Sequence, residues 1–311
     1  MLLCALLAGV TSGCQQSGTP AGHSPFTGKA ARAAPVLAVK IDNVRAARPQ
    51  TGLDAADIVY VERVESGLSR LLAVYSSRLP PAVGPVRSAR ESDLELLRQF
   101  GRPAFAYSGT QAKLEPAVEA APLYPLPPGR TGAAYFRGQD RAAPHNLYLR
   151  PERALKAAPG ASTAHDIGFR FGAAPKGGRN TPSYTARYPA ARFTFAWSAQ
   201  RQGWLVSMDG TPAKTASGQR LAAPTVVVQG VRIRPSRYHD RWGAYSPYTE
   251  TTGSGPARVL RDGKAYQARW SRPSPGGGTD FTTESGAPLT FAAGQVWVVY
   301  VPEEAVRGGA G

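Results

Sequence analysis

Short apolar runs alternate with polar, helix-prone segments through the first half of the chain. Residues 36–41 form one such run, which ends at Asp42-Asn43 and predicts a buried strand followed by a turn. Ser88 and Glu91 have the spacing of a capping box, and the apolar residues after them recur at helical intervals. The same patterns predict strands over 57–61, 71–75 and 103–107, and helices over 111–121 and 151–158. This alternation indicates a mixed α/β N-terminal domain over residues 35–171.

The pattern changes beyond residues 172–191, which are dense in Gly, Pro, Lys and Arg and are predicted to be a linker. Short β-rich runs then follow, with turn signals such as Asp209-Gly210 and Asp262-Gly263 between them. We predict strands over 193–197, 204–206, 225–228, 258–260, 266–270 and 296–301. These form a smaller, mostly β C-terminal domain over 192–303, a sandwich or barrel-like sheet, with a disordered tail over 304–311. The predicted fold class is α+β.

The chain begins with the pattern of an export signal. The apolar run over 2–10 is too short to cross a bilayer, which needs about 20 apolar residues, but it suits a secretory signal. Small residues lead to Cys14, after which the sequence turns polar, as in bacterial lipoproteins. We expect a signal peptide over 1–13, lipidation of Cys14, with palmitate as one acyl chain, and a flexible tether over 14–34. The alternatives are a plain secretory signal or a truncated core helix.

The remaining composition restricts the chemistry. The only two cysteines are Cys4 and Cys14, so a chain cleaved before a lipidated Cys14 has no thiol for a disulfide, a nucleophile or a metal site. The sequence contains no G-x-S-x-G, H-E-x-x-H, P-loop or S-x-x-K motif, and its four histidines are scattered. We therefore expect no metal and no cofactor.

The formal net charge is +16, and only seven of the 37 cationic residues are Lys. This charge suits a polyanionic partner such as anionic lipid or wall polymer, although a bias toward Ala, Arg, Gly and Pro accounts for it equally well. Export argues against nucleic acid as the partner. We expect an extracytoplasmic protein that is anchored to the cell membrane.

Polar residues cluster around predicted loops of the first half. Arginine recognises carboxylate and phosphate through paired hydrogen bonds, which predicts an anion-binding cleft. The candidate ligand-binding residues are Asn43, Arg48, Arg70, Arg87, Arg90, Arg141 and Asn146. The alternative is that these arginines pair with Asp42, Asp57 and Glu65 and only hold loops in place.

Six motifs of the first half resemble the DUF3048 family, the YerB-like group of bacterial lipoproteins. They are Val39-Lys40-Ile41-Asp42-Asn43, Ala47-Arg48-Pro49-Gln50-x-Gly52-Leu53, Ala56-Asp57-Ile58-Val59-Tyr60, Glu65-x-Gly67-Leu68-x-Arg70, Gly84-Pro85-Val86-Arg87-Ser88-Ala89-Arg90 and Pro144-His145-Asn146-Leu147-Tyr148. The second half resembles the family's C-terminal domain, so the likeness covers about residues 35–303. Two positions depart from the pattern, with Val61 in place of Glu and Ser66 in place of Gly. The resemblance implies a fold and a location and leaves the mechanism open.

Two further hypotheses remain. In the first, Asp42, Glu65 and His145 are candidate catalytic residues of a hydrolase or lyase that acts on envelope glycan or peptide. In the second, aromatic residues of the β half form an interaction surface. Those aromatics are Trp197, Trp204, Trp242, Tyr245, Tyr248 and Trp270. Most of them are expected in the core, whereas residues 238–248 are expected to form an exposed loop contact.

Overall fold

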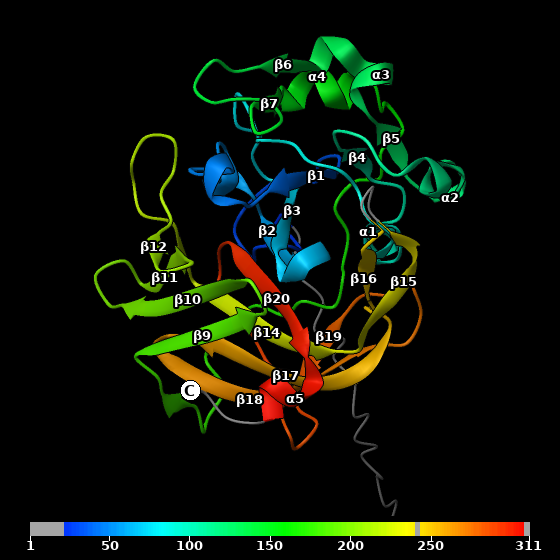
Figure 1. Ribbon diagram of the computed structural model, residues 1–311. Helices are drawn as coiled ribbons and strands as arrows, with labels where there is room; N and C mark the ends of the chain where they lie inside the picture. Colours follow the sequence, from blue (N-terminus) through cyan, green and yellow to red (C-terminus); the bar gives the residue numbers. More distant parts are fainter. Residues whose placement is uncertain (1–21, 240–242, 308–311) are drawn as a thin grey trace, which may run out of the picture.

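A single mixed sheet of eleven strands, drawn from both halves of the chain, forms the centre of the molecule (Figure 1). The computed structural model describes residues 22–239 and 243–307. The order along the sheet is β19-β18-β17-β14-β20-β2-β3-β1-β4-β5, and β8 pairs with β18. The strands are β1 (Leu37–Asp42), β2 (Ile58–Arg63), β3 (Ser69–Tyr75), β4 (Ala104–Ala106), β5 (Tyr124–Leu126), β8 (Arg179–Asn180), β14 (Thr225–Val231), β17 (Gly253–Arg261), β18 (Lys264–Arg272), β19 (Asp280–Thr282) and β20 (Val296–Pro302).

The last strand of the chain joins the two halves. β20 runs parallel to both of its neighbours, so that Val296 stands opposite Ile58 of β2 and Thr225 of β14. Parallel strands cannot be joined by a tight turn and need a long crossover connection. The neighbours of β20 can therefore be far from it in the sequence. The α+β fold class is confirmed, and the two halves share one sheet.

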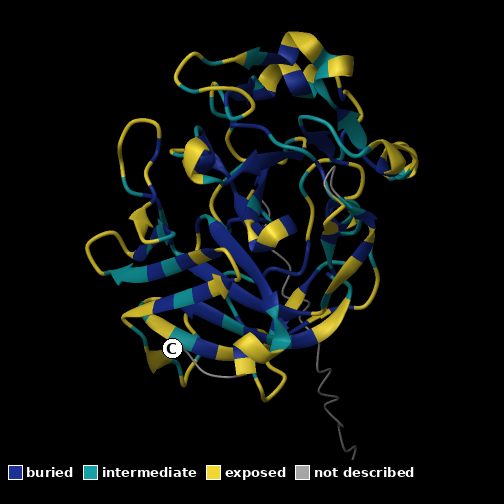
Figure 2. Ribbon diagram, viewed as in Figure 1, coloured by how far each residue is buried: buried dark blue, intermediate teal, exposed yellow. Residues whose placement is uncertain are grey.

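The central strands are largely buried (Figure 2), and the two faces of this sheet carry two apolar cores. Alternate residues of β1 point to opposite faces, so Leu37, Val39 and Ile41 enter one core and Ala38 enters the other. Lys40 and Asp42 share the face of Ala38. The sequence therefore brings two charged side chains to one face at the end of β1, where the candidate site lies.

A five-stranded sheet of β9 to β13 covers the first core, to which it contributes buried Phe193 and Trp204. Its strands are β9 (Ser183–Tyr188), β10 (Ala191–Ser198), β11 (Gly203–Met208), β12 (Thr211–Pro212) and β13 (Ala222–Ala223). The opposite core contains Leu96 and Leu97 of helix α1. The α-helices are α1 (Glu91–Leu97), α2 (Glu115–Ala120), α3 (Pro128–Thr131), α4 (Pro151–Lys156) and α5 (Glu303–Arg307). Among the described residues, no helix is long and apolar enough to span a membrane.

Two separate hairpins complete the fold, namely β6 (Tyr135–Arg137) with β7 (Leu147–Leu149), and β15 (Ile233–His239) with β16 (Tyr245–Thr249). The β15–β16 hairpin belongs to the second half but lies beside α1 of the first half (Figure 1). Tyr248 donates to Glu95 Oε2 at 2.7 Å, and the backbone N–H of Thr249 donates to Ser92 Oγ at 2.9 Å. These bonds fasten the hairpin to the first half.

Several sequence-based boundaries need correction. Residues 22–34 were expected in the flexible tether, but Phe26 is fully buried and packs against Phe100. β9 begins inside the expected linker, and α5 occupies part of the expected tail because Val306 packs into the core. Helix α1 begins at Glu91, and Asp93 Oδ2 accepts from the Arg90 backbone N–H at 2.6 Å, so Ser88 is not its cap. The signal peptide, Cys14 and residues 308–311 lie outside the described residues.

The aromatic residues of the second half are divided between core and surface. Trp204 and Trp270 are buried, whereas Tyr245 is 63% exposed. Residues 238–239 end strand β15 and residues 245–248 lie in strand β16, so these parts of the expected loop are strand, and Trp242 lies outside the described residues.

Candidate functional site

Three charged side chains lie in register across the central strands. Asp42 of β1 stands opposite Arg70 of β3, and Arg70 stands opposite Glu62 of β2. Directly opposed residues of antiparallel strands share one face. This row lies on the face of the sheet that α1 covers.

Asp42 holds two groups from distant segments. His145 Nδ1 lies 2.8 Å from Asp42 Oδ2, and Arg87 Nε lies 3.3 Å from the same oxygen. A carboxylate oxygen accepts hydrogen bonds, so Nδ1 is the donor of this pair, and Nε2 is the ring nitrogen that Asp42 does not hold. Asp42 is almost fully buried, whereas the other two side chains are partly exposed. Asp42 is therefore a buried carboxylate that the partly exposed side chains of His145 and Arg87 share.

Glu65 is paired with Arg90 through both carboxylate oxygens, at 2.6 Å to Nε and 2.8 Å to Nη2. Ser246 of the β15–β16 hairpin also donates to Glu65 Oε1. Burial raises the pKa of Glu65, but the hydrogen bonds and charge of Arg90 outweigh it and lower the pKa to about 2. Glu65 is thus held in an ion pair with Arg90, and its role as a general acid or base stays a prediction.

Arg70 is the one arginine of this group that lacks an acidic partner. Among the described residues, no carboxylate lies within 4.0 Å of its side chain, and its Nη1 donates to the Ser88 carbonyl at 3.0 Å. Burial, with the charges of Arg90 and Arg87, lowers the pKa of Arg70 to about 9. A partly buried cation beside two like charges is costly unless an anion joins it.

These arginines line a pocket of about 580 Å³, here called the Arg70 pocket. Its first wall comes from the segment before α1 and from Arg70 itself. Tyr238, His239, Gly243 and Ser246, from the β15–β16 hairpin, also line the pocket. The lining residues used below are Glu65, Arg70, Arg87, Arg90, Gln111 and Ser246. Both halves of the chain are therefore needed to form this pocket.

A buried charge cluster lies behind the pocket. Lys40 Nζ contacts Glu62 Oε2 and lies 2.6 Å from Asp93 Oδ1, and all three side chains are almost fully buried. Burial raises the pKa of Glu62 to about 7, although Lys40 opposes the shift. Asp93 also accepts from the Arg90 backbone, which connects the cluster to the pocket wall.

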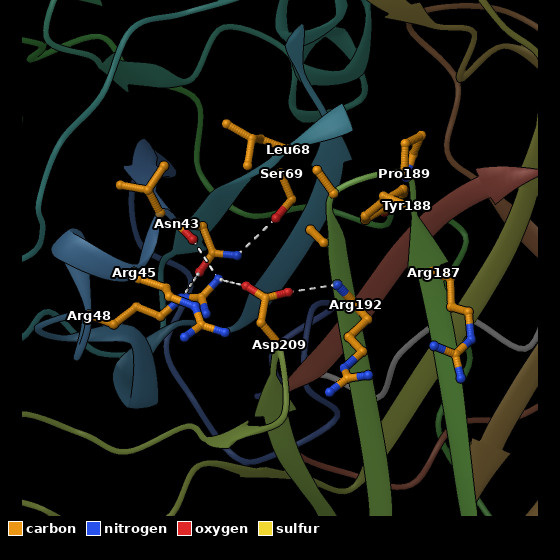
Figure 3. A pocket seen from close by; sticks show the side chains of 13 residues that line it. Asn43, Arg45, Arg48, Leu68, Ser69, Arg187, Tyr188, Pro189, Arg192 and Asp209 are labelled. Carbon is orange, nitrogen blue, oxygen red and sulfur yellow. Dashed lines mark hydrogen bonds and ion pairs between the residues drawn. The ribbon is translucent and has the colours of Figure 1, made fainter. Parts of the chain in front are cut away.

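The residues of the predicted anion-binding cleft lie at different places in the structure. Asn43 and Arg48 line a second pocket, between the first half and the five-stranded sheet (Figure 3). Arg141 pairs with neighbouring Asp140 at 2.8 Å, and Asn146 Oδ1 accepts from Arg137 at 2.8 Å, so both hold the β6–β7 hairpin. Arg70, Arg87 and Arg90 come together, while Arg141 and Asn146 do not join them.

The alternative in which arginines pair with loop carboxylates holds for some positions. Asp42 and Glu65 do pair with arginines, whereas Asp57 accepts from the backbone N–H groups of Ser76 and Ser77. No hydrogen bond or ion pair joins Glu65 to Asp42 or His145 in the described part of the chain.

Sequence reasoning missed the contribution of the second half. Ser246 and Tyr238 of the second half line the Arg70 pocket but carry no recognisable motif. The aromatic run near Tyr245 was the only signal, and it was interpreted as a loop. Asp93, by contrast, stands three residues after Arg90, which is the spacing of a helix N-terminal acceptor.

Comparison with known proteins gives consistent matches. The models "Protein of unknown function (DUF3048) N-terminal domain" and the corresponding C-terminal domain match residues 21–164 and 184–298. The chain is 27% identical over 278 residues to a Bacillus subtilis strain 168 protein named "Putative lipoprotein YerB", covering 86% of this chain and 81% of that protein. The crystal structure of the YerB protein from Bacillus subtilis superposes with a TM-score of 0.76 at 22% identity, covering 91% of this chain and 98% of that one. This structural likeness supports the fold.

Proposed function

The chain belongs to the DUF3048 family, and from that premise we propose that it is a lipid-anchored envelope protein that binds an anionic ligand at Arg70. The observation that carries the proposal is the missing partner of Arg70. Arg87 and Arg90 have Asp42 and Glu65, but among the described residues Arg70 has no carboxylate within 4.0 Å. A ligand carboxylate or phosphate at that position would complete its hydrogen bonds and offset its charge.

The charges around Arg70 set the kind of ligand. Arg87 and Arg90 pair with Asp42 and Glu65, so Arg70 is the one lining arginine without an acidic partner among the described residues. Glu65 and Glu91 also line the pocket, and they would repel a strongly negative group. A ligand with a single carboxylate, such as the free terminus of a wall-derived peptide, fits this balance.

Attachment at Cys14 would keep the pocket close to the membrane. The described residues begin at Gly22, and the eight residues 14–21 have a maximum reach of about 28 Å. Similarity to a protein named as a lipoprotein supports the anchor. Labelled palmitate should enter the wild-type protein but not Cys14→Ala, and equal labelling of the two would contradict lipidation.

Binding at Arg70 can be tested by calorimetry on the full-length chain kept soluble by Cys14→Ser. The titrants are acetate and solubilised wall fragments. Arg70→Gln should abolish the binding, while the control Arg153→Gln, on an exposed part of α4, should retain it. Binding that persists in Arg70→Gln would contradict the proposal.

A second candidate function rests on the Asp42–His145 hydrogen bond of 2.8 Å. A carboxylate that holds one nitrogen of histidine leaves the other available as a general base. If the protein is a hydrolase of wall fragments, His145→Ala should lose turnover without losing fold. Wild-type protein that binds these fragments but never cleaves them would exclude catalysis.

A further inference from the structure

The pocket between the two halves contains a pair of arginines in an unfavourable arrangement. Arg187 of β9 and Arg192 of β10 stand directly opposite each other in the antiparallel ladder. Side chains at such positions start only about 5 Å apart, and like charges there destabilise the sheet. Figure 3 shows both side chains at the edge of this pocket.

Within residues 22–239 and 243–307, no acidic side chain pairs with Arg187 or Arg192. In the described part of the chain, no carboxylate lies within 4.0 Å of the Arg187, Arg192 or Arg45 side chains, which all line the pocket. Asp209 is the one acidic lining residue, and its Oδ2 lies 2.8 Å from Arg48 Nη2. Its other oxygen accepts the backbone N–H of Arg192 at 2.8 Å. Asp209 is therefore already paired, and the exposed side chains of Arg45, Arg187 and Arg192 have no acidic partner among the described residues.

The turn after β11 makes room for one of these groups. Gly210 has φ 81°, and a Cβ at this position would lie 2.8 Å from Arg192 Nη2. A side chain there would push the guanidinium away. The glycine thus lets the Arg192 guanidinium lie against the turn.

The apolar part of the pocket lining suits an organic moiety that carries the anionic group. Its volume is about 480 Å³, and Val44, Leu68 and Pro189 form apolar parts of its wall. Leu68 is 37% exposed although it is a large apolar side chain. An apolar or sugar body could cover it while the charged group meets the arginines.

We propose that this second pocket, here called the Arg187 pocket, binds the phosphate group of a small organic phosphate. Four arginines and one aspartate give its lining a formal charge of +3 (4 − 1), which suits a dianion better than a single carboxylate. The Arg187 pocket lies between the first half and the five-stranded sheet, so a bound phosphate would contact both family domains. It is independent of the Arg70 pocket.

The test uses the full-length chain with Cys14→Ser and two probes, glycerol 3-phosphate in calorimetry and phosphatidylglycerol vesicles in sedimentation. The double variant Arg187→Gln/Arg192→Gln should weaken binding by about tenfold or more, because two charged hydrogen-bonding groups are lost. The matched control is Arg201→Gln, an exposed arginine in the turn between β10 and β11 and outside the pocket. Arg70→Gln should leave this binding unchanged, which separates it from the first proposal.

The two probes identify the source of the phosphate. Binding of the soluble probe that the double variant loses supports a free organic phosphate, and the same result with vesicles alone supports a lipid headgroup. Equal behaviour of wild type and double variant with both probes would overturn the proposal. The double variant should also melt no lower than the wild type, because the repulsion between the two arginines is removed; a large fall would show that the pair stabilises the fold.

Discussion

The Nδ1 atom of His145 lies 2.8 Å from Oδ2 of Asp42, and the two residues are 103 positions apart in the chain. The bond ties the loop before β7 to the end of β1. Arg87 shares the same carboxylate oxygen at 3.3 Å. Asp42 therefore organises the side of the site next to the Arg70 pocket without needing to touch a ligand.

Replacing Asp42 by Ala should lower the free energy of unfolding by roughly 2 kcal/mol, because two hydrogen-bonding groups lose a buried charged partner. Urea denaturation measures the change. The control is Asp140→Ala, which removes a half-exposed carboxylate that pairs with Arg141 and should cost less than about 1 kcal/mol. Equal losses in the two variants would show that the Asp42 cluster has no special role in stability.

Glu65 should make the free energy of unfolding depend on pH in the acid range. Its pKa is about 2 in the folded protein, below the ordinary value of 4.5, so the unfolded chain takes up the proton first. The stabilisation from this carboxylate is complete above pH 4.5 and is lost as the pH falls toward 2. Glu65→Gln should lower stability by roughly 2 kcal/mol at pH 7, with the difference vanishing near pH 2.

Denaturation curves measured across this pH range check the prediction. Exposed Glu152 on α4 offers the control, since Glu152→Gln should follow the wild-type curve throughout. A Glu65→Gln curve parallel to the wild type at every pH would refute the assignment.

Ser66 and Gly67 give an opposed pair of backbone tests. Ser66 has φ 56° and Gly67 has φ 69°, both in the left-handed region that favours glycine. Ser66→Gly should raise the melting temperature, with a gain of up to about 1 kcal/mol. Gly67→Ala should lower it, since a Cβ would lie 2.6 Å from Pro189 Cβ of the second half. Melting temperatures that move in the same direction would contradict this view of the turn.

The shared sheet predicts that the halves depend on each other. Separating residues 22–171 from 172–307 would leave β2 without β20, so neither fragment should fold alone. Each fragment should give a poorly dispersed NMR spectrum, and the full chain should unfold in one cooperative transition. Well-dispersed spectra from the separate fragments would show two independent domains.

The local elements could be predicted because their signals are local. β1, β3 and β14 follow apolar runs in the sequence, and the departure at Val61 fits the alternation, since Val61 enters one core while Glu62 faces Lys40 on the other side. The insertion of β20 between β2 and β14 could not be predicted, because apolar periodicity does not specify a distant partner.

The same limit applies to the candidate site. Glycine at 67 and the arginines before α1 marked the region, but the pairing of Arg90 with Glu65 depends on how two loops pack. The hairpin that supplies Ser246 comes from the other half and leaves Arg70 as the unmatched cation. Which arginine is unmatched follows from three-dimensional packing and not from spacing.

The most direct test of an anion site at Arg70 follows arginine side chains by NMR. In protein labelled with nitrogen-15 arginine, the Arg70 Nε signal is identified by its absence in Arg70→Lys. Acetate is then added at constant ionic strength, with Arg153 as an exposed reference. We predict a saturable shift of the Arg70 signal while Arg153 stays unmoved; an Arg70 signal that stays still, or that drifts without saturation as Arg153 does, would contradict the account.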